Sequence, residues 1–320
     1  MKPSFAVLVA LLLASQPPAR ADEPPFKSVN ELLRSHDKAL IRDLTEYVQK
    51  HPKADDRDEA YHALFDRAIE HDWFAENEAI AKKYLAEQPN GAVRPLAHII
   101  VTMARAQAGQ FQEALAQYKT LMAGVDKADQ EEFAASFADQ LATAATSAGE
   151  FAVTRQVYQV LLEHFGENPD LKRKVMDDLA RLDKVGKPAP VIVAREIDGK
   201  PFRLSDLKGK YVLVDFWATF AAPCVAELPT IKAAYDTYHA RGFDVVSVSL
   251  DEKVGPVHDF VRSRKVPWHQ IHDATGGGSP ADAFGVNNIP ASFLIDPQGK
   301  VIRLDLRGPA LEQALAKLIK

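Results

Sequence analysis

The sequence predicts two domains: an all-α helical-repeat domain over residues 22–183 and an α/β domain, a central mixed sheet flanked by helices, over residues 184–320. The length of 320 residues suits about two domains of ~150 residues each. Near residue 185 the pattern changes from apolar residues at helical spacing to short apolar runs that alternate with helical segments. The content of 47% hydrophobic and 26% charged residues favours packed cores and excludes disorder, collagen and a membrane bundle.

Residues 1–21 have the pattern of a signal peptide. Lys2 supplies a positive charge, residues 5–14 form an apolar run, and Ala19-Arg20-Ala21 matches a cleavage site. The run is too short to span a bilayer, which takes about 20 residues, so no transmembrane segment is expected. We therefore expect cleavage near Ala21 and export to the periplasm or beyond. The alternative is an N-terminal helix that belongs to a core.

The net charge and the number of cysteines argue against nucleic-acid binding and against sites that need two or more cysteines. The formal charge is −5, so nucleic acid is not expected as a partner. Cys224 is the only cysteine, which excludes an intramolecular disulfide, a four-cysteine zinc site and a two-cysteine redox couple within one chain. His269 and His272 fall on opposite faces of an extended segment, so we treat them as surface residues and expect no metal site and no cofactor.

The segment 22–183 contains two similar helix turns. In each, Ala-Gly is followed by an aromatic residue two positions after the glycine and by a tyrosine seven residues later; the two copies lie at 108–118 and 148–158. This layout resembles the tetratricopeptide class of repeats, although the offset exceeds the usual ~34 residues. A weaker third copy surrounds Trp73-Phe74. A plain helical bundle is the alternative, and either structure offers a docking or dimerisation surface, including one for a homodimer.

The α/β segment begins after the punctuating stretch 186–190, which carries two prolines. Strands are predicted at 191–197 and 202–204 around a turn at 198–200. Nearly continuous apolar runs at 211–216 and 243–250 predict buried parallel strands, joined by a helix over 223–239. A second helix over 256–265, a hairpin of 292–295 with 301–306, and a closing helix over 309–319 complete a sheet with helices on both faces.

Residues 184–320 resemble the TlpA/ResA-type branch of the thioredoxin-like superfamily, in the broader redoxin group related to AhpC/TSA. The matching segments run in the family's order across the whole second domain and do not extend into the helical domain. They are GKPAP, DGKPFRLSDLKGK, YVLVDFWAT, CVAELP, DVVSVSLDE and GVNNIPASFLIDPQGKV. The resemblance implies a thioredoxin-like fold and descent from thiol-disulfide oxidoreductases with a role in cell redox homeostasis.

The reactive centre departs from the family pattern. Where the family reads W-A-T-W-C-x-P-C, this sequence reads W-A-T-F-A-A-P-C over 217–224, so Ala221 replaces the first cysteine. In the family that cysteine lies at a helix N-terminus, which depresses the pKa of the thiol and makes the thiolate the nucleophile. Alanine has no atom that can attack a disulfide. The site is degenerate, and ordinary dithiol-disulfide exchange is not expected.

Other features of the family site remain. Asp215 matches the buried acid that takes a proton from the second cysteine, and its side chain should point toward Cys224; an aspartate that points to water is the alternative. Pro290, after Ile289, matches the family's cis-proline, whose loop pairs with an extended substrate peptide. We expect an apolar groove that can still hold a peptide, lined by Trp217, Phe220, Ile289 and Pro290.

Three interpretations of Cys224 remain open: an inert buried residue, a lone thiol that reacts with peroxide, and a sulfur that pairs with another chain. Our hypothesis is an exported module that binds protein or peptide clients or serves in assembly. The alternative is a single-cysteine redox enzyme, a peroxidase or a monothiol oxidoreductase, that uses Cys224 with Asp215 as a proton acceptor. A third possibility is a scaffold in which the helical domain carries the function.

Overall fold

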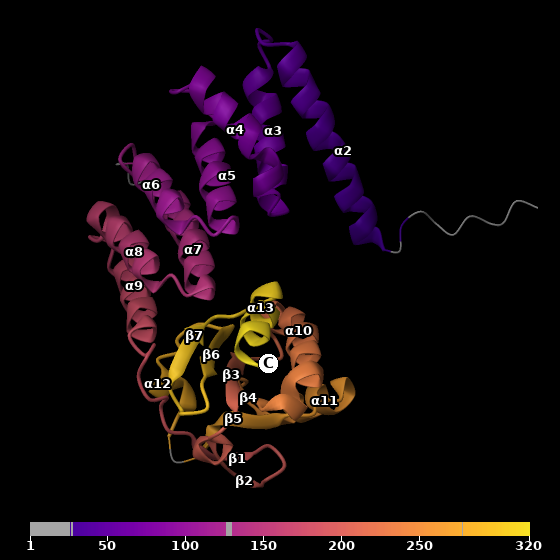
Figure 1. Cartoon of the computed structure of the whole chain (residues 1–320), viewed down its shortest axis with the longest axis vertical. Helices are drawn as coiled ribbons and strands as arrows, with labels where there is room; N and C mark the ends of the chain where they lie inside the picture. Colours follow the sequence, from indigo (N-terminus) through magenta and orange to yellow (C-terminus); the bar gives the residue numbers. More distant parts are fainter. Residues whose placement is uncertain (1–25, 27, 126–129, 277) are drawn as a thin grey trace, which may run out of the picture. The chain divides into compact units, whose positions relative to one another are not determined.

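The computed structural model describes residues 26, 28–125, 130–276 and 278–320; the predicted signal peptide lies outside the described residues. The chain divides into two compact units, whose elements are labelled in Figure 1. One contains the described residues up to Trp73 together with Gly91–Val93, and the other contains Phe74–Asn90 and Arg94–Lys320. Within the described residues, no helix combines the length and apolar character needed to cross a membrane. The predicted domain boundary at residues 183 and 184 stays a prediction.

The first unit is built on two helices, α2 (Val29–Lys50) and α3 (Arg57–Glu70). Ser28 begins α2 as its N-cap, because its hydroxyl accepts a hydrogen bond from the N–H of Glu31. Helix α3 buries an apolar face that includes Tyr61, Leu64 and Phe65. Helix α2 buries only Val48. Most of the surface of α2 is therefore exposed.

Six more helices in the described residues precede the sheet. They are α4 (Phe74–Glu87), α5 (Arg94–Gln107), α6 (Phe111–Met122), α7 (Glu131–Ala148), α8 (Phe151–Phe165) and α9 (Pro169–Leu182). The two predicted turns separate α5 from α6 and α7 from α8. Gly109 and Gly149 occupy them with φ of 75° and 87°, which glycine adopts readily because it lacks a Cβ. The chain is all-helical here, and a true repeat array stays a prediction.

The second unit also contains a seven-stranded mixed sheet in the order β2-β1-β5-β4-β3-β6-β7. The pairs β3·β4 and β4·β5 are parallel and the other pairs are antiparallel. The strands are β1 (Val193–Glu196), β2 (Pro201–Arg203), β3 (Tyr211–Trp217), β4 (Phe243–Ser249), β5 (His269–Gly276), β6 (Ala291–Ile295) and β7 (Val301–Leu304). The α/β prediction, with its parallel crossover and its hairpin, is confirmed.

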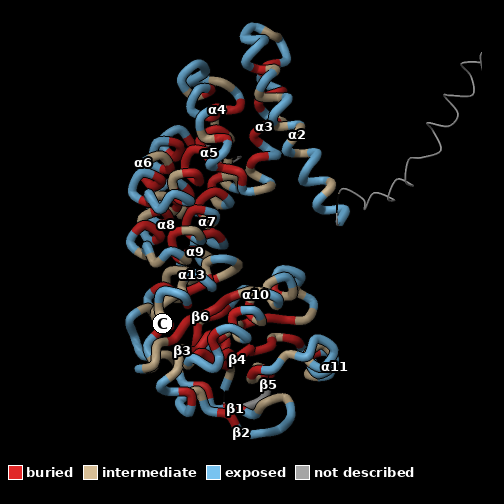
Figure 2. The backbone as a smooth tube through the Cα atoms, turned by 45° about the vertical axis from the view of Figure 1, so that its right-hand side comes forward, coloured by how far each residue is buried: buried red, intermediate tan, exposed pale blue. Residues whose placement is uncertain are grey.

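Helices cover both faces of the sheet, as predicted. Side chains of α10 (Ala222–Tyr238) and α13 (Pro309–Leu318) pack in one cluster with Leu213 of β3. Those of α12 (Pro280–Phe284) pack in the opposite cluster with Val214. Helix α11 (Val254–Arg264) contributes Val257 to a small cluster near the end of β3. Figure 2 shows the central strands as largely buried segments of the chain.

The prediction for His269 and His272 as surface residues is wrong for His272. Both histidines belong to β5, and His272 is buried, with Nε2 2.6 Å from the carbonyl oxygen of Asp251. The reason is topological: β5 lies inside the sheet, between β1 and β4. A side chain on either face of an interior strand meets a covering layer. His269 is partly exposed and lies 3.1 Å from Glu196.

Candidate functional site

A short loop carries the chain from β3 into α10 and is tied to the end of β4. The N–H of Leu250 donates to the carbonyl oxygen of Trp217 at 2.8 Å, so the end of β3 stays paired. The next residues of the loop are held by Asp251, whose carboxylate accepts from the backbone N–H and the hydroxyl of Thr219. Ser249 donates to the same carboxylate at 2.8 Å. Sequence reasoning missed this hydrogen-bond network. The only feature of the sequence that could have indicated it is Asp251, which directly follows the predicted buried strand 243–250.

Ala221 is the N-cap residue of α10. Its φ of −88° and ψ of 97° are extended, and the helix begins at the next residue with Pro223 in its first turn. The position is half-buried, and no side chain caps the helix there. The first N–H groups of a helix carry a partial positive charge that stabilises an anion. The side chain of Ala221 is a methyl group, which carries no charge that this partial positive charge could stabilise. The position therefore has no nucleophile.

Cys224 lies one turn inside α10 and is 5% exposed. It packs with Trp217 and Val257, and the partly buried Ala221 and Ile289 border the same cluster. Burial raises the pKa of the Cys224 thiol, and the nearby negative charge of Asp215 raises this pKa further. Both effects favour the protonated thiol, which is a poor nucleophile and a poor metal ligand.

Asp215 lies in the middle of β3, with Ser247 of β4 and Ser292 of β6 directly opposite it on the neighbouring strands. The hydroxyl of Ser247 donates to its carboxylate at 3.4 Å. Burial of the carboxyl group raises the pKa of Asp215 to about 7, against the opposing effects of the Ser247 hydrogen bond and the Arg307 charge. The negative charge of Asp215 raises the pKa of the Cys224 thiol, so the two groups interact electrostatically. Asp215 can therefore exchange a proton near neutral pH.

The loop before β6 contains Ile289 and Pro290, and the peptide bond between them is cis. Both residues are half-buried. Among the residues that the structure describes, no backbone partner occupies the N–H or C=O of Ile289. These two groups can pair with an extended peptide, as the edge of a sheet does.

Two residues that sequence reasoning missed hold this loop in place. The Arg307 guanidinium donates to the carbonyl oxygen of Pro290 at 2.5 Å, and the Asp305 carboxylate accepts from the N–H of Ser292 at 3.1 Å. Asp305 has a φ of 50°, an uncommon conformation for a residue other than glycine. No motif in the sequence pointed to either residue.

The four residues predicted to line an apolar groove take different positions. Phe220 is 74% exposed, directly before the N-cap of α10. Trp217 is buried, and its ring centroid lies 5.1 Å from that of Phe260. Trp217 therefore packs in the buried cluster with Cys224 and does not line a surface groove. Phe220, Ile289 and Pro290 are at least partly exposed. Within the described residues, no group of three or more His, Cys, Asp or Glu side chains could hold a metal ion.

Comparison with known proteins gives a family model, curated relatives and solved structures that are similar to this chain. The model of the AhpC/TSA family matches residues 185–304. Thiol-disulfide oxidoreductase ResA from Bacillus thuringiensis subsp. konkukian is 34% identical over 137 residues, which cover 43% of this chain and 78% of the relative. ResA from Bacillus subtilis is 36% identical over 119 residues, 37% of this chain and 65% of the relative. The thioredoxin domain of a thiol-disulfide oxidoreductase from Bacteroides vulgatus aligns with a TM-score of 0.39 and 28% identity, over 42% of this chain and 98% of that chain.

Proposed function

The chain belongs to the ResA-like thiol-disulfide oxidoreductase family of thioredoxin-fold redoxins, and from this premise we propose that it is an exported peptide-binding or assembly module without dithiol activity. One observation carries the proposal: Ala221 stands at the N-terminus of α10, near a loop in which the backbone groups of Ile289 have no backbone partner among the described residues. Export is supported by the signal-peptide pattern of residues 1–21.

Loss of dithiol chemistry follows from the atoms at the site. In disulfide exchange, a thiolate attacks one sulfur of a disulfide, the S–S bond breaks, and the second sulfur leaves as a thiolate. A neighbouring thiol then resolves the mixed disulfide. This chain has one sulfur at the site, and that sulfur is buried with a raised pKa. The attacking group is absent, and no second thiol of this chain can resolve an intermediate.

Peptide binding does not need the missing sulfur. An extended peptide that adds to a sheet gains main-chain hydrogen bonds, and pockets for alternate side chains give specificity. Ile289 offers the main-chain groups, while Phe220 offers an exposed aromatic ring for an apolar side chain. Arg307 and Asp305 hold the loop in a fixed conformation, which lowers the entropy lost on binding.

The test uses the full mature chain and a fluorescein-labelled library of unstructured decapeptides, read by fluorescence anisotropy. We expect a subset of the library to bind, and we expect Phe220→Ser to weaken binding by about tenfold, because an exposed aromatic anchor contributes about 1 to 2 kcal/mol. Val191→Ser is the matched control, since Val191 is 80% exposed and lies outside the proposed site. The same protein should not accelerate the reduction of insulin by dithiothreitol.

Two outcomes contradict the proposal. Catalytic reduction of insulin by the unmodified chain would show that dithiol chemistry has survived by another route. Equal loss of peptide binding in Phe220→Ser and Val191→Ser would show that binding does not depend on the loop and the helix N-terminus.

A second candidate function is single-cysteine redox chemistry at Cys224. The observation that favours it is Asp215, whose pKa of about 7 allows its carboxylate to accept a proton near neutral pH. The thiolate would attack peroxide, the O–O bond would break to give a sulfenic acid and hydroxide, and an external thiol would restore the cysteine. Burial and the raised pKa of the thiol oppose this reaction. Dimedone labelling after addition of peroxide, read by intact mass, tests whether Cys224 forms a sulfenic acid. We expect labelling of Cys224 only in denaturant, and fast labelling of the folded chain would favour the redox enzyme.

A further inference from the structure

A polar cavity of about 560 Å³ lies within the second unit. One wall comes from α7, α8 and α9, and the other comes from the loop at Asn287–Pro290 and the segment at Leu304–Arg307. Figure 1 shows the end of α7 close to β7, whose C-terminal end leads into that segment. The volume falls in the range of about 300 to 1,000 Å³ that is typical of ligand sites.

The cavity is continuous with the loop proposed to bind a peptide. Pro290 lines it, and the neighbouring Asn287 and Asn288 add exposed amide side chains. Arg307, which holds the carbonyl oxygen of Pro290, also lines it. A peptide that pairs with the backbone of Ile289 would therefore lie next to the residues that line this cavity.

The helical wall is fastened to the same loop through Asp305. Arg181 of α9 donates to the Asp305 carboxylate at 3.0 Å and pairs with Asp178 at 3.1 Å. Ser147 of α7 donates to the carbonyl oxygen of Asp305 at 3.0 Å. The contacts from Arg181 and Ser147 therefore both reach Asp305, whose carboxylate also accepts from the N–H of Ser292. The two walls are thus joined by buried or half-buried hydrogen bonds, which fix the cavity's shape.

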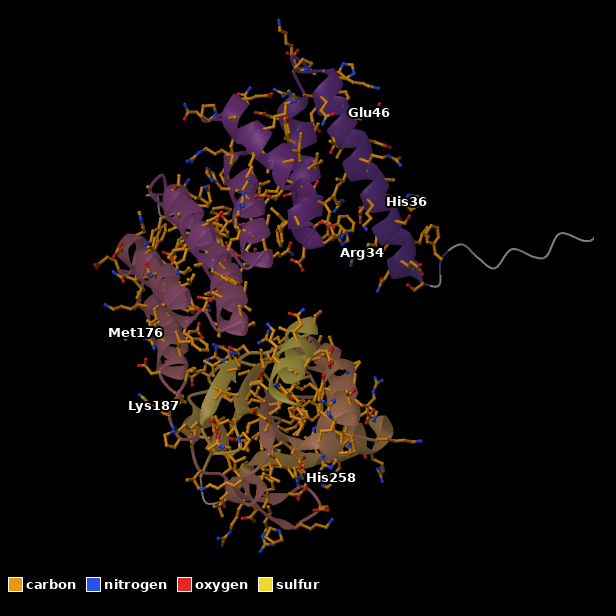
Figure 3. All side chains as sticks on the ribbon, in the orientation of Figure 1. Arg34, His36, Glu46, Met176, Lys187 and His258 are labelled. Atoms are coloured by element: carbon orange, nitrogen blue, oxygen red, sulfur yellow. The ribbon has the colours of Figure 1, made fainter. Side chains whose placement is uncertain are left out.

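The charged side chains on the walls give the cavity a net negative charge, and Arg307, the one cation there without a carboxylate partner among the described residues, donates to the carbonyl oxygen of Pro290. Five aspartates and four lysine or arginine residues line the cavity. Arg173 pairs with Asp170 at 2.8 Å, Lys174 contacts Asp139 at 2.5 Å, and Arg181 serves Asp178 and Asp305. Asp177 of α9 is half-buried and has no hydrogen bond or ion pair among the described residues. The neighbouring Met176 is 53% exposed on the outer side of the helix (Figure 3).

We propose that this cavity is a second subsite for the peptide client, which receives a polar flank of the bound segment and places a lysine or arginine side chain against Asp177. The proposal rests on the proposed function, because the peptide enters from the Ile289 loop. A basic side chain matches the Asp177 carboxylate in charge. Its long aliphatic part fits beside Leu182 and Leu304, which also line the cavity.

The experiment uses the mature full chain and a positional library of decapeptides, each with a single Lys, Glu or Ala at one scanned position, read by fluorescence anisotropy. We expect Lys to be preferred over Glu at one fixed distance from the segment that binds the loop, by about fivefold. We expect Asp177→Asn to abolish this preference, and rising salt to reduce it in the unmodified chain. Glu163→Gln, an exposed carboxylate of α8 outside the cavity, is the control and should keep the preference.

Failure of this inference can be told from failure of the proposed function. If no peptide in the library binds the unmodified chain, the proposed function fails and the subsite fails with it. If peptides bind and Phe220→Ser weakens them, but Lys, Glu and Ala are equivalent at every position, only the subsite is overturned. A Lys preference that survives Asp177→Asn also overturns it, because the carboxylate responsible would lie elsewhere. Circular dichroism of Asp177→Asn, expected to match the unmodified chain, separates loss of preference from loss of fold.

Discussion

Ala221 is the N-cap of α10, and it packs against the same small cluster as Ile289 of the loop before β6. Its backbone is already extended, and its Cβ borders the cluster that contains Cys224. The position offers a helix N-terminus, which would stabilise a thiolate, but it carries no sulfur. The absence of a thiol at this position is therefore a local difference that a single substitution can test.

We expect Ala221→Cys to restore a C-x-x-C pair with Cys224. The new thiol would lie at the helix N-terminus, where its pKa falls and its thiolate forms readily. Under a mild oxidant the variant should lose two protons by intact mass, and with dithiothreitol it should reduce insulin at least tenfold faster than the unmodified chain. Ala222→Cys, at the exposed next position, is the matched control. Absence of an internal disulfide in Ala221→Cys would show that the two positions are not held as the geometry implies.

Asp215 makes the stability of the protein depend on pH. Its folded pKa of about 7 lies above the ordinary value of 3.8, so the folded state binds more protons than the unfolded state between these values. This group therefore stabilises the fold least above pH 7, and its effect makes stability fall as pH rises from about 4 to about 7. Burial of the carboxylate is the cause.

The variant Asp215→Asn should lose this dependence, because an amide does not titrate. Relative to the unmodified chain, we expect the free energy of unfolding of the variant to be about 1 to 3 kcal/mol larger at pH 8 than at pH 5, because the variant does not bury a charged carboxylate at pH 8. Urea denaturation at both pH values measures the difference. Asp259→Asn, an exposed residue of α11, controls for the general loss of a carboxylate. A difference that is the same at both pH values would contradict the raised pKa.

At the scale of elements, α9 connects the helical segment to the peptide loop through Arg181. The side chain of Arg181 is 17% exposed and pairs with two carboxylates that are themselves mostly buried. Removing a buried cation leaves its partners charged and poorly solvated, which costs more than the pair itself contributes. Burial already raises the pKa of Asp178, so this carboxylate is sensitive to the loss of Arg181.

We expect Arg181→Gln to lower the free energy of unfolding by about 2 to 4 kcal/mol. Arg173→Gln on the same helix is the matched control, because its ion pair with Asp170 is exposed and should contribute less than about 1 kcal/mol. Urea denaturation measures both variants. An equal effect of the two substitutions would show that the Arg181 contacts do not stabilise the join between α9 and the loop. A double-mutant cycle with Asp305→Asn isolates their interaction energy.

Most elements of the sheet domain could be predicted from local pattern. The apolar runs that became β3 and β4 have the composition of buried parallel strands, and the proline and glycine turns delimit the hairpin of β6 and β7. The place of β5 could not be predicted in this way, because its sequence alternates His, Gln and Asp with apolar residues and looks half-exposed. Its burial comes from its neighbours in the sheet, which no local pattern contains.

At the scale of the whole molecule, the sequence indicated the class of each segment and the identity of the degenerate position. It did not indicate the cavity or the residues that hold the loop. Arg181 and Asp305 are 124 residues apart, and Arg307 and Pro290 are 17 apart. Contacts of this kind depend on how packed elements meet, so they become visible only when the fold is known. Asp215 and Cys224 could be identified from the sequence as candidate site residues, because both match positions of the family motif.

The two compact units should differ in local stability. Helix α2 in the first unit buries only Val48 and leaves Val29, Leu33 and Leu40 exposed, whereas β4 is buried along its length. Backbone amides exchange fastest where few apolar contacts oppose opening. We expect hydrogen-exchange mass spectrometry to show α2 exchanging at least a hundredfold faster than β4 in dilute protein. Protection of α2 that grows with protein concentration would instead support the predicted homodimer, with α2 at its interface.

The anchoring of the peptide loop by Arg307 and Asp305 has a consequence for inheritance. These two residues are encoded more than eighty codons after Ala221, and neither contributes an atom to disulfide exchange. Under the proposed function, a change at codon 221 alone removes or restores the attacking thiol, whereas the contacts that hold the loop depend on other codons. The thiol and the shape of the loop can therefore be inherited separately.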